Sequence, residues 1–303
     1  MTSTPFPPPS KQARNPHPLQ CLEVWGGSSA ADHSASVPGL DISVSSRPIE
    51  GSEAGGDIYL ISSCSSGWIS RILLADVSGH GSDVSDLSYK LRKAMHRSIN
   101  TVDQSKLARS LNTSFDEIAD GSKFATALLM TYFAPSGHLI FVNAGHPPPL
   151  LKRAGSDTWI PLDSTTPGIL RETSSEIKVG IKNLPLGVIN STQYEQLAIQ
   201  IRKGDRVCAY TDAFSESRHP EKGLIGSNGL ANVMDEAFDA DHEDHAQSVL
   251  NTLDSKGYEK AEDDHTLLML HHNGMQRPKV SVPTLSNLIK NSFGLGHIDT
   301  FVQ

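Results

Sequence analysis

Hydrophobic and polar residues alternate in the first half of the chain in the way that β-strands require. Three apolar residues separated by polar ones predict the first strand: Leu40, Ile42 and Val44. Longer apolar stretches follow at 57–64 and 68–77, and the turn-forming sequence Ser65-Ser66-Gly67 lies between them. This arrangement predicts a β-hairpin.

The spacing of apolar residues changes to three and four after residue 77, which is the spacing of a helix face. Five residues carry this pattern in the first predicted helix: Val84, Leu87, Leu91, Ala94 and Met95. Leu107, Leu111 and Phe115 repeat it and predict a second helix over 104–118. A pair of amphipathic helices therefore follows the hairpin.

The rest of the chain is mainly strand-like until it approaches its C-terminal part. Apolar runs bounded by Gly, Pro and Asp predict strands at 124–133, 138–143, 149–152, 197–201 and 206–211. Helices are predicted at 228–238 and 242–253, and a last strand at 266–271. This order of elements predicts an α+β fold with mainly antiparallel sheets.

Changes in composition divide the chain into four parts. Residues 1–20 are rich in Pro, Ser and polar residues and are predicted to be disordered. The Gly/Ser-rich segment 21–39 leads into one domain that spans 40–272. In the tail, 273–303, four apolar residues allow a short amphipathic helix, although a frayed terminus is an equal alternative: Leu285, Leu288, Ile289 and Phe293.

Charge and cysteine usage exclude some classes of protein. The chain has 303 residues and a formal net charge of −8, whereas nucleic-acid-binding proteins usually carry a basic face. Three cysteines without paired or metal-ligand spacing indicate a reducing compartment: Cys21, Cys64 and Cys208. The N-terminus has no apolar core of signal-peptide length, and no stretch approaches the roughly 18 apolar residues of a membrane span. We therefore expect a cytoplasmic protein that binds neither nucleic acid nor a membrane.

Four aspartates stand at the edges of apolar or turn-forming segments: Asp57, Asp76, Asp212 and Asp263. Hairpin pairing would place Asp57 near Asp76, and the other two could meet them if several strand ends converge. Carboxylates gathered in this way repel one another unless a cation lies between them, and Mg²⁺ or Mn²⁺ prefers such hard oxygen ligands. The alternative is that each aspartate only accepts backbone hydrogen bonds at a strand-to-turn junction.

Six short motifs occur in a fixed order around these aspartates. They are Gly55-Gly56-Asp57-Ile58-Tyr59, Asp76-Val77-Ser78-Gly79-His80-Gly81, Asn143-Ala144-Gly145-His146-Pro147-Pro148, Leu184-Pro185-Leu186-Gly187, Tyr210-Thr211-Asp212 and Asp263-Asp264-His265-Thr266. Together they resemble the SpoIIE-type branch of the PPM family of metal-dependent Ser/Thr phosphatases. The resemblance extends from about Leu40 to Leu270.

The resemblance implies an αββα sandwich, in which two sheets are flanked by helices, with a centre of two Mn²⁺ or Mg²⁺ ions at one end. It assigns the bridging role to Asp76 and a further contact to the carbonyl of Val77, and Asp57, Asp212 and Asp263 complete the ligand set. Two cations that share a carboxylate lower the pKa of a water between them, and the resulting hydroxide attacks phosphorus in line.

The sequence leaves several residues near the motifs open to two interpretations. In the family a glycine follows the third aspartate, but Ala213 stands here, which would be strained if that position needs a positive φ.

His80 and His146 could orient a carboxylate or a loop, and a hydrogen-bonding role is favoured over proton transfer. Because adjacent strand residues face opposite ways, we expect Asp263 to bind metal and Asp264 to hold a loop. Arg47 could contact a substrate phosphate, but packing on the surface is favoured.

The favoured function is hydrolysis of phosphoserine or phosphothreonine on a regulatory protein, such as an anti-sigma-factor antagonist in a bacterial signalling circuit. Regulation would come from the N-terminal segment, the tail or a separate protein, and the resemblance implies that the helical pair at 83–118 is where switching occurs. One alternative is an inactive pseudophosphatase that only binds a partner, for which Ala213 is the single support. Another is a two-metal nuclease, against which the acidic charge argues.

Overall fold

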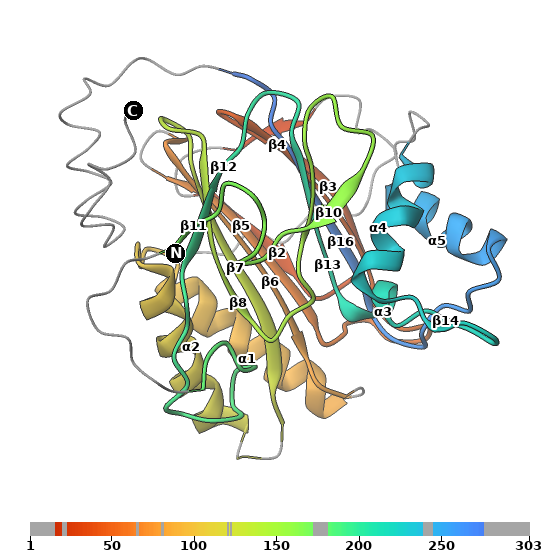
Figure 1. Cartoon of the computed structure of the whole chain (residues 1–303). Helices are drawn as coiled ribbons and strands as arrows, with labels where there is room; N and C mark the ends of the chain where they lie inside the picture. The colour runs from red at the N-terminus through yellow and green to blue at the C-terminus, as the bar shows by residue number, and fades with distance from the viewer. Residues whose placement is uncertain are drawn as a thin grey trace.

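The computed structural model describes residues 16–19, 23–64, 67–79, 82–119, 121, 123–171, 181–238 and 245–275. The hairpin turn at 65–66, most of the N-terminal segment 1–20, His80 and the predicted helix of the C-terminal tail lie outside the described residues. Two seven-stranded sheets form the centre of the molecule (Figure 1). Every strand pair in them is antiparallel except β1–β3.

Within each sheet the strands lie side by side in the following order. The first sheet contains β1 (His17–Pro18), β3 (Ala31–Val37), β4 (Leu40–Arg47), β16 (His265–His271), β13 (Arg206–Tyr210), β9 (Leu150–Lys152) and β10 (Trp159–Pro161). The second sheet contains β11 (Leu170–Arg171), β12 (Leu197–Gln200), β8 (His138–Ala144), β7 (Ala125–Phe133), β6 (Ile69–Val77), β5 (Asp57–Cys64) and β2 (Val24–Gly27).

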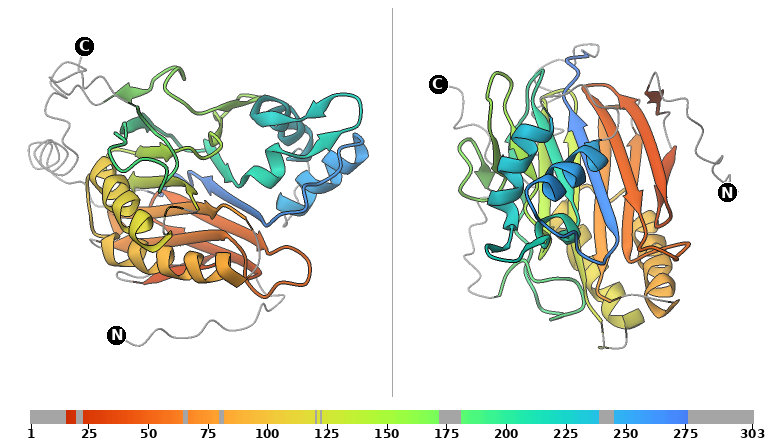
Figure 2. Two further views of the ribbon diagram at one scale, coloured as in Figure 1. Left: turned by 90° about the horizontal axis from the view of Figure 1, so that it is seen from below. Right: turned by 90° about the vertical axis from the view of Figure 1, so that its right-hand side faces the viewer.

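Helices cover the outer face of each sheet. Helices α1 (Ser82–Ser98) and α2 (Gln104–Ala119) pack on the second sheet, and α4 (Gly226–Ala237) and α5 (His245–Ser255) pack on the first (Figures 1 and 2). A one-turn helix, α3 (Asp212–Ser215), and a small hairpin of β14 (Arg218–His219) and β15 (Gly223–Leu224) follow β13. The layers are helix, sheet, sheet and helix, so the predicted αββα sandwich is confirmed.

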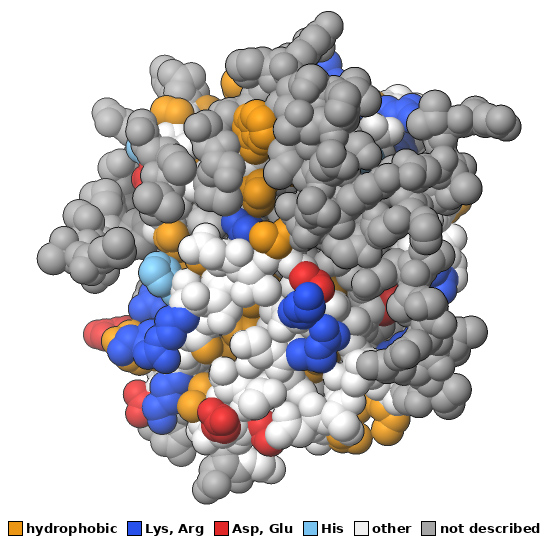
Figure 3. Space-filling view, turned by 90° about the vertical axis from the view of Figure 1, so that its left-hand side faces the viewer, with side chains coloured by type: hydrophobic (Ala, Val, Ile, Leu, Met, Phe, Trp, Pro, Cys, Tyr) orange, Lys and Arg blue, Asp and Glu red, His pale blue; other side chains and the backbone are white. Residues whose placement is uncertain are grey.

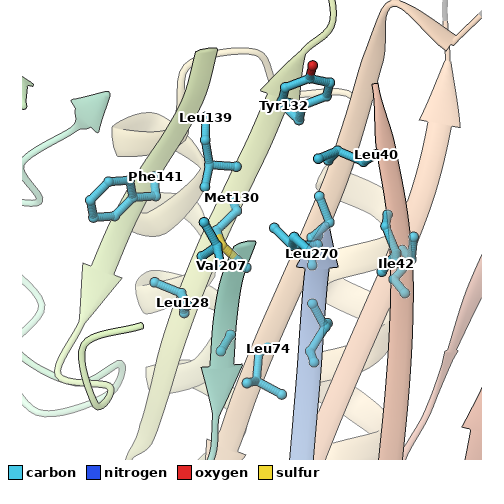
Figure 4. Packing of buried hydrophobic residues seen from close by; sticks show 14 of the residues in the cluster. Leu40, Ile42, Leu74, Leu128, Met130, Tyr132, Leu139, Phe141, Val207 and Leu270 are labelled. Atoms are coloured by element: carbon cyan, nitrogen blue, oxygen red, sulfur yellow. The ribbon is translucent and has the colours of Figure 1, made fainter. Parts of the chain in front are cut away.

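Three buried apolar clusters fill the spaces between these four layers. Between the sheets, Leu40 and Leu270 of the first sheet face Leu74, Met130 and Phe141 of the second (Figure 4). A second cluster lies between the second sheet and α1 and α2, and a third lies between the first sheet and α4 and α5. Since both faces of each sheet are buried, strands such as β7 are buried at almost every position.

The predicted elements agree with these bounds apart from a few short segments. The segment 21–39, expected only to lead into the fold, contributes β2 and β3 to the two sheets. β3 has the sequence ADHSASV, whose small and polar residues hide the strand pattern even though Ala31, Ala35 and Val37 are buried. Among the described residues, no helix is long and apolar enough to cross a membrane.

One side of the molecule shows how its charges are distributed. On the face in Figure 3, Lys and Arg side chains stand in separate groups, and acidic side chains lie beside them. The described side chains on this face therefore form no continuous basic surface of the kind that binds nucleic acid.

Candidate active site

The first two aspartates lie opposite each other on the hairpin. Asp57 begins β5 and pairs directly with Asp76 near the end of β6, so the prediction that they are hairpin neighbours is confirmed. Their side chains share the face that carries Tyr59 and Leu74 into the space between the sheets. Asp57 is only 3% exposed, which makes its ionised form costly.

The other two aspartates come from neighbouring strands of the first sheet. Asp212 opens α3 two residues after the end of β13, and Asp263 lies two residues before β16. Since β13 and β16 are paired, with Tyr210 opposite Leu267, their chain ends bring these carboxylates to the same end of the sandwich.

The carboxylates act on one another electrostatically. Burial, followed by the charges of Asp212, Asp263, Asp264 and Glu216, raises the pKa of Asp76 to about 8. Burial and then the charge of Asp76 hold the pKa of Asp57 well above its usual range. The pKa of Asp212 rises to about 6, again first through burial and then through Glu216 and Asp263. These shifts place Asp76 within electrostatic reach of the other three predicted aspartates.

A backbone oxygen completes the acidic surface beside Asp76. A Cβ on Gly56 would lie 2.7 Å from the carbonyl oxygen of Val77 and 3.4 Å from Oδ1 of Asp76. Both oxygens therefore line the space beside the Cα of Gly56, and a side chain at this position would fill that space. The carbonyl oxygen of Val77 therefore lies near the Asp76 carboxylate, and its role as a metal ligand stays a prediction.

The donor set fits a hard divalent cation in chemistry and charge. Every candidate ligand is an oxygen atom, and burial and neighbouring carboxylates raise the pKa of both Asp57 and Asp76. Within the described residues, however, no three His, Cys, Asp or Glu side chains are already gathered closely enough to hold an ion. The carboxylates lie at the same end of the sandwich without forming such a group.

Asp264 holds a loop by hydrogen bonds as predicted, although it precedes β16 instead of lying in the strand. It is buried, and its two carboxylate oxygens accept the backbone N–H groups of Ile49 and Gly56. A Cβ on Gly55 would clash with this carboxylate, so the Gly55-Gly56 pair lets the loop close over it. Asp264 thereby fixes the segment that leads into Asp57.

His146 is a neutral buried residue that connects β7 with the end of β8. It is 5% exposed, and burial lowers its pKa to about 3. Its Nδ1 lies 2.8 Å from Oγ1 of Thr126, the residue opposite Asp76 on β7, and its backbone N–H donates to Oδ1 of Asn143. A residue that stays neutral at pH 7 in these contacts has the favoured hydrogen-bonding role.

The structure removes the concern about Ala213. This residue is buried in the one-turn helix α3, and the only described non-glycine residue with positive φ is Asn183. No backbone strain therefore arises from alanine at this position.

One charged residue near the site was missed in the sequence. Glu216 ends α3 four residues after Asp212, and its carboxylate contributes to the raised pKa values of both Asp76 and Asp212. The i to i+4 spacing was visible, but the one-turn helix that makes the two residues neighbours was not predicted.

Arg47 is about half exposed and hydrogen-bonds residues of the neighbouring strand β3. Its guanidinium donates to Asp32 at 2.6 Å and to the carbonyl oxygens of Ala31 and Ser46. Both members of the ion pair are about half exposed, so its contribution to stability is small.

We expect Arg47→Ala to change the free energy of unfolding by no more than about 1 kcal/mol, because an exposed ion pair is screened by solvent. Phosphatase activity should stay within about twofold of wild type, since the guanidinium faces Asp32 rather than the aspartate cluster. Urea unfolding and steady-state kinetics measure the two quantities. A loss of activity of tenfold or more at unchanged stability would show that Arg47 contacts substrate.

The αββα sandwich and the aspartates at one end of it define the class of PPM-type phosphatases. The chain belongs to the family described as Stage II sporulation protein E (SpoIIE), whose model matches residues 69–273. Phosphoserine phosphatase RsbU of Bacillus subtilis is 23% identical over 201 residues, which are 66% of this chain and 55% of RsbU. The chain therefore spans about half the length of the curated relative it matches.

Three solved structures share the fold. The RsbU and RsbW domains of a Mycobacterium tuberculosis protein match with a TM-score of 0.64 and 23% identity, over 87% of this chain and 70% of theirs. The PP2C phosphatase domain of SpoIIE from Bacillus subtilis, with a fragment of its regulatory domain, matches with a TM-score of 0.59 and 17% identity, over 77% and 63%. RsbX in complex with magnesium matches with a TM-score of 0.53 and 14% identity, over 80% and 99%.

Proposed function

We propose that this chain is a metal-dependent protein phosphatase that hydrolyses phosphoserine or phosphothreonine on a regulatory protein. The observation that carries the proposal is the mutual repulsion of Asp57, Asp76, Asp212 and Asp263 at one end of the sandwich. Membership of the SpoIIE family and the likeness to RsbU support the same activity.

The cofactor of this reaction would be two Mn²⁺ or Mg²⁺ ions. Asp76 would hold both, the carbonyl of Val77 would hold one, and Asp57, Asp212 and Asp263 would complete the set. When bound, such ions supply an activated water and neutralise charge on the phosphoryl oxygens. The fold shared with RsbX, whose structure contains magnesium, supports a divalent cation here.

The reaction exchanges one bond to phosphorus for another. The oxygen of water forms a bond to phosphorus as the bond to the serine or threonine oxygen breaks, and that oxygen takes up a proton. The protein's own residues keep the acidic cluster in place: Asp264 fixes the loop before Asp57, and the neutral His146 anchors Thr126 opposite Asp76.

The substrate class follows from the family rather than from the site. A phosphorylated anti-sigma-factor antagonist in the cytoplasm is the partner we propose, with a separate regulatory protein acting on the helical pair at 83–118. The pseudophosphatase alternative loses its support, because Ala213 is unstrained and all four aspartates are present.

The proposal predicts hydrolysis of a phosphoserine peptide and of an aryl phosphate that starts on addition of Mn²⁺ or Mg²⁺ and stops on chelation. The rate with metal should exceed the chelated rate by at least about 100-fold, because the cations supply both the nucleophile and the charge stabilisation. Phosphate release under matched ionic strength measures it. A wild-type protein that is inert with both metals and both substrates would contradict the proposal.

A further inference from the structure

Asp57 is held by a hydroxyl group from the opposite sheet. Oγ1 of Thr211 donates to Oδ2 of Asp57 at 2.8 Å, and Thr211 is fully buried. Asp57 belongs to the second sheet, whereas Thr211 follows β13 of the first sheet and precedes α3. The contact therefore joins the two sheets at the end that carries the aspartate cluster.

The same hydroxyl group makes two contacts with Thr266. The backbone N–H of Thr266 donates to Oγ1 of Thr211 at 2.9 Å, so the hydroxyl oxygen is an acceptor there. The carbonyl oxygen of Thr266 lies 3.5 Å from Oγ1 of Thr211, so Oδ2 of Asp57, at 2.8 Å, is the nearer acceptor of the single hydroxyl hydrogen. Valine in place of Thr211 would keep the shape but lose both interactions.

The hydroxyl group of Thr266 also contacts Asp57. Oγ1 of Thr266 lies 2.9 Å from Oγ of Ser46, and the Thr266 side chain also hydrogen-bonds Asp57 and lowers its pKa against the larger effects of burial and of Asp76. Thr211 and Thr266 are both completely buried, and solvent cannot substitute for them. Thr266 lies on β16 and Thr211 follows β13 directly, so both hydroxyl groups occupy buried positions where an apolar side chain would otherwise fit.

We propose that Thr211 is a positioning residue that sets the orientation of the Asp57 carboxylate for a divalent cation. The inference rests on the proposed function, because it gives Asp57 the ligand role assigned there. The hydrogen bond restricts the rotation of the carboxylate about its χ angles and leaves Oδ1 as the oxygen that Thr211 does not occupy. Groups that orient metal ligands in this way typically change metal affinity by about 10–100-fold when removed.

The test compares Thr211→Val with Thr211→Ser and with Thr131→Val. Thr131 is a matched control because it is a buried strand threonine whose hydroxyl has no hydrogen-bond partner in the described structure. Mn²⁺ affinity is measured directly, by electron paramagnetic resonance of free Mn²⁺ and by the Mn²⁺-dependent rise in melting temperature. The activation constant for Mn²⁺ and kcat at saturating Mn²⁺ are measured alongside.

Thr211→Val is expected to bind Mn²⁺ about tenfold or more weakly while kcat at saturating Mn²⁺ falls only a few-fold. Thr211→Ser should keep an affinity within about threefold of wild type, and Thr131→Val should not differ from it. If Thr211→Val does not fold, Thr211→Cys tests the same point, since a thiol of near-equal volume is a weak donor. Wild-type affinity in the Val or Cys variant, or an equal loss in the Ser variant, would overturn the inference.

The outcomes separate this inference from the proposed function. If wild type binds Mn²⁺ but hydrolyses no phosphoester, the phosphatase proposal fails, and the affinities still decide the role of Thr211. If wild type is active and Thr211→Val binds Mn²⁺ normally, only the role of Thr211 fails. If wild type binds neither Mn²⁺ nor Mg²⁺, both fail.

Discussion

Asp76→Asn is expected to abolish metal-dependent phosphatase activity and also to make the metal-free protein more stable. Activity should fall by about 10²–10³-fold or more, because the carboxylate proposed to hold both cations is replaced by a neutral amide. Stability should rise because the amide removes a charge that burial and four neighbouring carboxylates disfavour. A residue kept only for folding would not show these opposite effects.

The raised pKa of Asp76 determines how the stability of the metal-free protein changes with pH. In the folded protein the pKa of Asp76 is about 8, whereas the unfolded value is near 3.8. A raised folded pKa means that the folded state binds more protons, so metal-free wild type should lose stability as the pH rises from about 4 to about 8. Since one unit of pKa corresponds to about 1.4 kcal/mol and the neighbours titrate together, the advantage of Asp76→Asn near pH 8 should be on the order of a few kcal/mol.

The measurement is urea unfolding in chelator between pH 5 and pH 8, repeated with saturating Mn²⁺. Asp254→Asn is the control, because Asp254 is an exposed aspartate on α5. Mn²⁺ should stabilise wild type most at high pH and Asp76→Asn least. Parallel pH profiles of wild type and Asp76→Asn in chelator would show that the Asp76 carboxylate is not buried among like charges.

The strand and helix patterns predicted most of the fold because each layer of the sandwich buries one face of its neighbours. Leu91 and Leu111 mark the helix faces that cover the second sheet, and the apolar runs of β5 and β6 mark two adjacent strands of that sheet. The same local logic found Asp57 and Asp76, since a short turn fixes which residues of a hairpin face each other. The sequence patterns therefore predicted the structure where the contacting residues are close together in the sequence.

What the sequence patterns did not indicate depends on contacts between distant segments. The hydrogen bond from Gly56 to Asp264 joins residues 208 apart, and that from Thr211 to Asp57 joins residues 154 apart. The sequence around Thr211 and around Thr266 does not distinguish either residue from a threonine that is present only because threonine favours strands. The polar network around Asp57 becomes visible only when β13 and β16 are placed opposite β5.

The loop that contains Leu184-Pro185-Leu186-Gly187 belongs to the packing of the second sheet rather than to the acidic cluster. Leu186 exchanges backbone hydrogen bonds with Ala125 at the start of β7. The side chain of Asn112 on α2 accepts the N–H of Gly187 at 2.8 Å and donates to the carbonyl of Ile189. This motif thus connects α2 to the strand that lies beside β6, which explains its place among the family motifs in structural terms.

Phe115→Ala is expected to cause the largest loss of stability among single core substitutions at this junction. Phe115 is fully buried on α2, and a Cβ on Gly187 would lie 2.8 Å from its ring, so the ring fills the space that the glycine leaves. Truncation to alanine should cost about 3–5 kcal/mol through lost burial and the cavity that remains. For a domain of this size the melting temperature should fall by roughly 10 °C or more.

Two variants make this result specific to the junction. Phe115→Leu retains most of the volume and should cost clearly less, and Phe124→Ala removes a ring that is 44% exposed and should cost about 1 kcal/mol or less. At temperatures where Phe115→Ala remains folded, its affinity for Mn²⁺ should match wild type, because Phe115 packs on α2 and the 184–187 motif and not on the aspartates. A cost of Phe115→Ala below that of Phe124→Ala would contradict the packing role, and a loss of Mn²⁺ affinity in the folded variant would show that the helical pair is coupled to the metal site.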